Sequence, residues 1–245
     1  MVMFMAETEL KFEYLWENGP RFAQAQHFKL GTDSVLLADF VRFTGTKRGI
    51  DLGCASGALA LLLLTKHEKL HMTGLEILPE AAELAKTNMV ENSLQARSEI
   101  ICGDIRRHRE LFKSGSFELV LSNPPYFPEN SGFVSPKEGR ANARAEGLCT
   151  LDDLCAAASF LLKTGGSFNL VHKPERLSEV FCAMAKHGLE PKRLRMVCHT
   201  VDKAPNLVLI EGRRGGKPGL VVEPNLVLRN PDNSESDEVR RIYHR

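Results

Sequence analysis

The sequence predicts an α/β fold, with helices on both faces of a sheet whose strands are mostly parallel. After residue 48, short apolar runs alternate with segments of helical periodicity. This alternation is typical of strand–helix–strand units, which place their helices over the faces of the sheet. With 245 residues, 43% of them hydrophobic, the chain is long enough for one large domain with an ample core.

The chain divides into three parts by composition. Residues 1–30 are predicted to be an N-terminal extension, irregular or with short strands. Residues 31–230 contain the strand–helix alternation and form the main domain, and residues 231–245 form a polar C-terminal tail.

Seven strands are predicted in the main domain. Short apolar runs bounded by turn residues indicate strands. Such runs lie at residues 48–53, 71–77, 98–104, 117–123, 167–174, 193–200 and 206–214.

Helical periodicity predicts the elements between these strands. Helices are expected at residues 32–41, 58–67, 79–92, 151–162 and 175–187. Thr32 and Thr150 are suited to cap two of them, because a threonine hydroxyl can accept from the first unpaired N–H groups. Pro79 is tolerated in a first helical turn, and Gly165-Gly166 is expected to stop the helix that follows Thr150.

The first predicted strand leads into a glycine-rich turn, Asp51-Leu-Gly-Cys-Ala-Ser-Gly, a place where α/β folds bind nucleotide-like cofactors. The dinucleotide fingerprint G-x-G-x-x-G needs glycine at 53, 55 and 58, but residues 55 and 58 are alanine. The S-adenosyl-L-methionine (SAM) pattern, acidic-x-G-x-G-x-G, is matched by Asp51, Gly53 and Gly57, with Ala55 as the departure. The turn therefore favours SAM over NAD.

Acidic residues lie at three successive strand ends. Asp51 belongs to the first strand, Glu76 closes the second and Asp104 closes the third. Glu76 could accept hydrogen bonds from both ribose hydroxyls of a cofactor, and Asp104 one from an adenine amino group. The alternative is that each carboxylate is only a helix cap or a turn residue. Together with the turn, the set predicts a SAM site.

The fourth predicted strand ends in Asn123-Pro-Pro-Tyr-Phe. Proline cannot donate to a sheet, so the strand must stop at Asn123. An amide or aromatic amine is a weak nucleophile, because its lone pair is delocalised. The Asn123 side chain and the Pro124 carbonyl could accept from its two N–H groups and orient it, and Tyr126 could stack on a flat acceptor. The alternative, a simple chain turn, is less favoured after a SAM-type turn.

The turn and the Asn-Pro-Pro-Tyr motif together resemble the class I amino-methyltransferases, and the resemblance extends over nearly the whole chain. Residues 28–40, 143–177, 190–197 and 206–220 are similar to the tRNA (adenine-N6)-methyltransferase branch, which includes the tRNA(Val) family. The resemblance implies a Rossmann-like sheet of seven strands, the last antiparallel, with helices on both faces. A second departure, Glu223-Pro-Asn-Leu, stands where a Pro-Pro-Leu run is more usual.

The resemblance also implies a role for individual residues. Asn123, Pro124 and Tyr126 would be the catalytic residues that hold the target amine and base. The residues that would bind SAM are Lys29, Gly31, Thr32, Asp33, Asp51, Gly53, Gly57, Glu76, Ile77, Asp104, Ile105 and Asn123. Those that would contact the substrate are Pro125, Phe127, Arg140 and Arg144.

The expected activity is SAM-dependent N6-methylation of an adenine in structured RNA, first of all the anticodon loop of tRNA. The motif is shared with enzymes that act on other amines, so ribosomal RNA guanine or adenine and release-factor glutamine stay as alternatives. A non-catalytic SAM- or RNA-binding module is another. About 30 residues before the main domain leave no room for the helical domain of glutamine methylators. A single domain suits a compact RNA whose unpaired or flipped base enters the site.

The composition of the chain limits which partners it can have. The formal net charge is only +1, so phosphate contacts would come from the local basic stretches 106–109, 192–195 and 213–217. The alternative for each stretch is a solvated surface. The six cysteines show no metal-ligand spacing, so no metal is expected, and free thiols with no apolar run of membrane length indicate a cytoplasmic protein.

Overall fold

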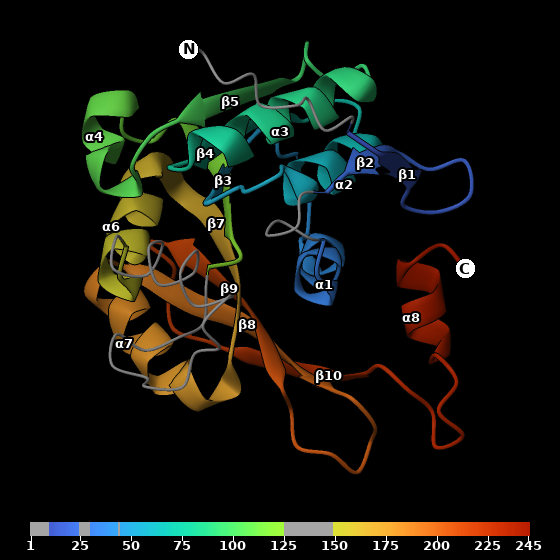
Figure 1. Ribbon diagram of the computed structural model, residues 1–245. Coiled ribbons are helices and arrows are strands. Elements are labelled where there is room, and N and C mark those ends of the chain that lie inside the picture. The colour runs from blue at the N-terminus through green and yellow to red at the C-terminus, as the bar shows by residue number, and fades with distance from the viewer. Residues whose placement is uncertain (1–9, 25–29, 44, 125–148) are drawn as a thin grey trace, which may run out of the picture.

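The computed structural model describes residues 10–24, 30–43, 45–124 and 149–245, and its fold is α/β, as predicted (Figure 1). At its centre is an eight-stranded sheet with the order β10-β8-β9-β7-β6-β3-β4-β5. A separate hairpin of β1 (Phe12–Tyr14) and β2 (Arg21–Ala23) precedes it.

The strands of the sheet are β3 (Arg48–Leu52), β4 (His71–Glu76), β5 (Ser98–Cys102), β6 (Phe117–Ser122), β7 (Leu162–His172), β8 (Leu189–Cys198), β9 (Leu207–Arg214) and β10 (Val221–Val227). The bounds of β3, β4, β5, β6 and β9 follow the predicted runs, but β7 begins at Leu162 and β8 at Leu189, several residues before the runs predicted for them. Strand β9, the seventh of the sheet in chain order, is antiparallel to both its neighbours, whereas the other pairs are parallel. The expected antiparallel seventh strand is confirmed.

The expected number of seven strands is wrong by one, because β10 adds an eighth strand beside β8. Pro224 lies inside β10 and cannot donate a hydrogen bond to the sheet. Proline is tolerated here because β10 is an edge strand, and its pairing with β8 shifts register between Glu223 and Leu226.

Helices cover both faces of the sheet (Figure 1). They are α1 (Thr32–Phe40), α2 (Ala58–Lys66), α3 (Pro79–Glu91), α4 (His108–Leu111), α6 (Leu151–Leu161), α7 (Leu177–Lys186) and α8 (Asp237–Ile242), with 3₁₀ turns at Ile105–Arg107 and Pro174–Arg176. Helices α1, α2 and α8 share one apolar core with the sheet, and α6 and α7 share the other. Successive residues of β6 alternate between the two, since Leu119 and Leu121 face the first core and Val120 faces the second.

The capping residue is confirmed for one helix and wrong for another. Thr150 caps α6 through a capping box, in which its hydroxyl accepts from Asp153 N at 3.1 Å and Asp153 accepts from Thr150 N at 3.0 Å. Thr32 is not a cap. The extended backbone that precedes α1 belongs to Gly31, and Thr32 is already the first helical residue.

The end of α6 also differs from the expectation. The helix ends at Leu161, and β7 begins at the next residue, where Leu162 pairs with Phe117. Gly165 and Gly166 therefore lie inside β7 and do not stop the helix. Pairing with β6 takes over directly from the helix, so no glycine is needed at that boundary.

The C-terminal segment contributes to the core. In α8, Val239 and Ile242 are buried in the cluster that contains α1 and α2. The segment 231–245 is polar in sequence, but these two side chains anchor it to the fold.

Candidate active site

The carboxyl ends of four parallel strands meet at one edge of the sheet. Strands β6, β3, β4 and β5 are neighbours in that order (Figure 1). Asp51 lies near the end of β3, Glu76 ends β4, Asp104 follows β5 by two residues and Asn123 follows β6 directly. The four side chains singled out from the sequence are thus placed along a single edge, where open α/β sheets bind ligands.

The glycine-rich turn between β3 and α2 holds three residues in left-handed backbone conformations. Gly53 has φ +78°, Ala55 has φ +45° and Gly57 has φ +81°. The departure from the motif at Ala55 is therefore also a point of strain, of about 1–2 kcal/mol for an L-residue. A Cβ on Gly53 would meet no atom of the described chain within 4 Å, so the turn backbone is open to a ligand at this point.

Glu76 fixes the conformation of the turn. One carboxylate oxygen, Oε2, accepts from Ala55 N at 2.8 Å, and the other, Oε1, accepts from Leu78 N at 3.0 Å. The residue is only 7% exposed. Each oxygen keeps a second lone pair, which is compatible with the predicted role at the cofactor ribose. That role stays a prediction.

Asp51 is buried without compensation for its charge. It is 1% exposed, and its Oδ1 has no hydrogen-bond partner among the described residues. Burial, with a smaller effect of the nearby Glu76 charge, raises the pKa of Asp51 from 3.8 to about 8. A buried carboxyl with one oxygen that has no hydrogen-bond partner among the described residues suits a ligand bearing N–H donors and positive charge. SAM carries both an ammonium and a sulfonium.

Asp104 already has partners within the protein. Its carboxylate accepts from Arg106 N at 2.9 Å and from the Arg106 guanidinium, with a shortest distance of 2.6 Å. These contacts hold the pKa of Asp104 below its ordinary value. Ile77 follows Glu76 in the chain and Ile105 follows Asp104, and both isoleucines are half-buried. The predicted contact of Asp104 with the cofactor adenine would have to share the carboxylate with Arg106.

Asn123 lies beside the first turn of α1. Its Nδ2 donates to Ser34 Oγ at 3.0 Å, across 89 residues of sequence. The preceding residue, Ser122, donates to Leu52 O at 2.8 Å and so ties the end of β6 to β3. The structure thus brings Gly31, Thr32 and Asp33, at the start of α1, to the same strand end as Asn123.

Several predicted residues lie outside the described part of the chain. These are Lys29, Pro125, Tyr126, Phe127, Arg140 and Arg144. Pro124 is described and half-buried, directly after Asn123.

Two residues that sequence reasoning missed support this edge. Ser34 holds the Asn123 amide, as described above. Asn88 of α3 is fully buried and bonds to the hairpin and to the turn at once. It accepts from Ala23 N at 2.8 Å and donates to Ala23 O at 3.1 Å and Ser56 O at 3.0 Å. A signal for Asn88 exists in the sequence, since it is a polar residue on the alanine-lined face of a predicted helix.

Over the described ranges, no three His, Cys, Asp or Glu side chains gather in a way that could hold a metal ion. In the same part of the chain, no helix has the length and apolar character needed to cross a membrane.

Solved methyltransferase structures share this fold. A predicted O-methyltransferase from Agrobacterium tumefaciens superposes with a TM-score of 0.72 at 20% identity, covering 87% of this chain and 96% of that one. The geranyl diphosphate C-methyltransferase of Streptomyces coelicolor, solved with S-adenosyl-L-homocysteine, gives 0.56 at 14% identity, covering 74% and 78%. The sheet order, the strained turn and the carboxylates at its edge define the class of the protein, a class I SAM-dependent methyltransferase.

Residues 25–187 match the family model described as the methyltransferase small domain, and the chain belongs to this family. Similar proteins include the tRNA1(Val) (adenine(37)-N6)-methyltransferase of Tolumonas auensis, 32% identical over 211 residues, or 86% of each chain. The protein of the same name from Porphyromonas gingivalis is 31% identical over 191 residues, 76% of this chain and 74% of the relative. The protein is a SAM-dependent N-methyltransferase, and SAM is its cofactor.

Proposed function

We propose that this protein methylates N6 of an adenine in tRNA, and that the adenine is residue 37 in the anticodon loop of tRNA1(Val). The support for the tRNA substrate comes from relatives of that name, which align over most of their own length. The cytoplasm, where tRNA is modified, is the compartment in which we place this activity.

The observation that carries the proposal is the position of Asn123. It stands at the end of β6, next to the strand whose turn suits SAM, and its amide nitrogen is bound to Ser34 at 3.0 Å. With the nitrogen directed at Ser34, the amide oxygen points to the other side. An oxygen held in this way can accept a hydrogen bond from an exocyclic amine and limit its rotation.

Different residues would hold the cofactor. Asp51 would accept from a cationic part of SAM, because its carboxyl is buried and Oδ1 lacks a partner among the described residues. Gly53 and Gly57 would let the turn backbone approach the ligand, and Glu76 would keep the turn in its strained form. Bound SAM would supply an electrophilic methyl group and leave as the neutral thioether S-adenosyl-L-homocysteine, and the surplus N6 proton would leave to water.

Asn123 and Pro124 would act on the amine rather than on the proton. Two carbonyl oxygens, one from the Asn123 side chain and one from the Pro124 backbone, would accept the two N–H groups of N6. This arrangement aligns the nitrogen lone pair with the methyl group, so its benefit belongs to the transition state more than to binding. An amide is not a base, and none is required if the proton leaves after transfer.

The substrate is tested with labelled SAM and two unmodified tRNA1(Val) transcripts, one natural and one with guanosine in place of adenine 37. We expect label in the first transcript only, and N6-methyladenosine as the labelled nucleoside after digestion and mass spectrometry. Label in both transcripts would move the site within the tRNA. Label in neither, but in ribosomal RNA or in a release-factor glutamine, would contradict the proposal.

A further inference from the structure

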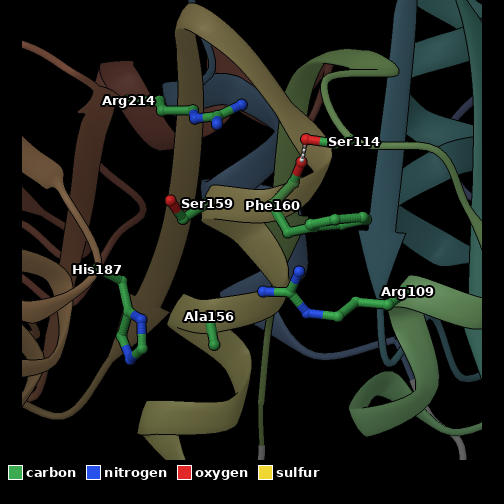
Figure 2. A pocket seen from close by; sticks show the side chains of 7 residues that line it. All are labelled: Arg109, Ser114, Ala156, Ser159, Phe160, His187 and Arg214. Carbon is green, nitrogen blue, oxygen red and sulfur yellow. Dashed lines mark hydrogen bonds between the residues drawn. The ribbon is translucent and has the colours of Figure 1, made fainter.

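A cavity of about 430 Å³ opens beside α6, away from Asn123. Figure 2 shows that its side chains come from segments that are far apart in the sequence. Arg109 belongs to α4, Ser159 and Phe160 to the last turn of α6, His187 follows α7, and Arg214 ends β9. Helix α6 begins at Leu151, near the active-site edge of the sheet. Ser159 is eight residues further along, or about 12 Å from that end of the helix.

Most arginines of the three basic stretches form ion pairs with carboxylates of the same chain. Their ion pairs are Arg106–Asp104, Arg107–Glu110, Arg193–Glu211, Arg195–Glu238 and Arg213–Glu211. Arg109 and Arg214 differ, because neither forms an ion pair with a carboxylate of the described residues. Both line the cavity. The stretches therefore do not act as a uniform phosphate track, and their uncompensated guanidinium groups converge on one place.

The cavity offers donors and no carboxylate. The Arg109 guanidinium lies 4.6 Å from the centre of the Phe160 ring, which orients it. Arg214 uses Nη1 to donate to Leu162 O and retains its other N–H groups. The Ser159 hydroxyl has no hydrogen-bond partner within the described ranges. His187, which lines the cavity, binds Asp152 Oδ1 at 2.9 Å, and Lys186 binds the same oxygen at 2.8 Å.

Two like charges facing one cavity repel each other, and an anion between them would relieve that repulsion. Guanidinium groups match phosphate oxygens in geometry, and a serine hydroxyl adds a third kind of donor. The volume exceeds that of one phosphate, so the cavity can admit a phosphodiester with part of its nucleoside. Figure 2 shows the two arginines on opposite sides of Phe160, Arg109 on the Ala156 side and Arg214 on the Ser114 side.

We propose that this cavity binds a backbone phosphate of the RNA substrate, at a second contact apart from the methyl-transfer site. The RNA source of the phosphate rests on the proposed function. A contact of this kind positions an RNA without reading its sequence. It would let a chain with a net charge of only +1 retain a large substrate while one base is in the active site.

The test measures tRNA binding by fluorescence anisotropy between 50 and 200 mM KCl, for the wild type and for Arg109→Gln and Arg214→Gln. We expect each substitution to weaken tRNA affinity about tenfold and to reduce the slope of log Kd against log salt by about 1. SAM affinity and kcat at saturating tRNA should not change. The matched control is Arg240→Gln, which removes the same charge from an exposed pair on α8 and should bind as the wild type does.

Each alternative gives a different result. Equal tRNA affinity and equal salt slopes in the wild type and Arg109→Gln would overturn the proposal, even if the protein still methylates tRNA. A further outcome is that inorganic phosphate or a mononucleotide stabilises only the wild type, with tRNA affinity equal in all variants. The cavity would then serve a free anion, which also contradicts an RNA contact. If the wild type neither binds nor methylates tRNA, the proposed function itself fails. Arg109 is exposed, so its variant remains informative if Arg214→Gln does not fold.

Discussion

Asp51 holds a proton at neutral pH when no ligand compensates it. Its carboxyl is buried next to Glu76, and its pKa of about 8 lies far above the 3.8 of an exposed aspartate. Above about pH 4 the unfolded chain releases this proton, whereas the folded protein keeps it until about pH 8. Over that interval the folded state binds more protons, so its stability must fall as pH rises.

This difference gives a pH-dependent prediction. The free energy of unfolding of the wild type should fall relative to that of Asp51→Asn as pH rises from 5 to 8, because asparagine cannot titrate. The measurement is urea unfolding of both proteins, free of SAM, at several pH values in that range. A constant difference between the two proteins would mean that Asp51 is ionised in the folded state.

Ser34 is a positioning residue for Asn123, since it contacts the Asn123 amide and not the reacting atoms. Ser34→Ala should lower kcat about three- to tenfold, the effect of one neutral hydrogen bond, with no change in KM for SAM. Ser34→Thr, which keeps the hydroxyl, should restore most of kcat. The control Ser116→Ala removes a hydroxyl that binds Lys113 O away from the site. Loss of SAM affinity in Ser34→Ala, or failure of threonine to restore kcat, would exclude this role.

At the scale of elements, α3 connects the N-terminal hairpin to the cofactor turn. Asn88 forms three hydrogen bonds in the interior, two with Ala23 of β2 and one with Ser56 of the turn. Gly57 packs on the same helix, because a Cβ there would lie 3.1 Å from Ala85 Cβ. The turn is thus supported from one side by Glu76 and from the other by α3.

Asn88→Ala should lower the free energy of unfolding by about 2 kcal/mol or more, because it leaves buried backbone groups unpaired. It should also weaken SAM binding, since the Ser56 carbonyl loses the hydrogen bond from Asn88. Asn92→Ala is a matched control on the same helix. Asn92 bonds to Arg21 N and O at 2.8 and 2.7 Å, but it is only half-buried and Arg21 is exposed, so we expect a loss below about 1 kcal/mol. Equal losses in the two variants would contradict the account of α3.

For the molecule as a whole, the sheet and its ligand edge could be predicted from sequence. Strand–helix alternation implies parallel strands, and parallel strands bring their carboxyl ends to one edge. Asp51, Glu76 and Asn123 could therefore be placed together without knowledge of any contact between them. The glycine turn was recognisable because its positive φ angles favour glycine, although Ala55 adopts one as well.

Other features depend on contacts that local patterns do not contain. Ser34 and Asn123 are 89 residues apart, and Asn88 and Ala23 are 65 apart. An arginine forms an ion pair only if folding brings a carboxylate near it. The basic stretches of the sequence therefore do not indicate that Arg109 and Arg214 share a cavity. Strand β10 was missed because its proline is tolerated only at a sheet edge, and edge position is a property of the assembled sheet.

Two groups of residues at one edge of the sheet have separate roles in this account. Those of β3 and β4 hold SAM, and Asn123 orients the amine. The most direct test measures SAM affinity by calorimetry and single-turnover methyl transfer to tRNA, both on the same preparation of Asn123→Ala. Asn225→Ala, an exposed asparagine of β10, is the control. We predict a SAM Kd within about twofold of the wild type and a rate reduced about 100-fold or more. A variant that transfers methyl groups normally, or one whose SAM affinity falls as much as its rate, would contradict this division of roles.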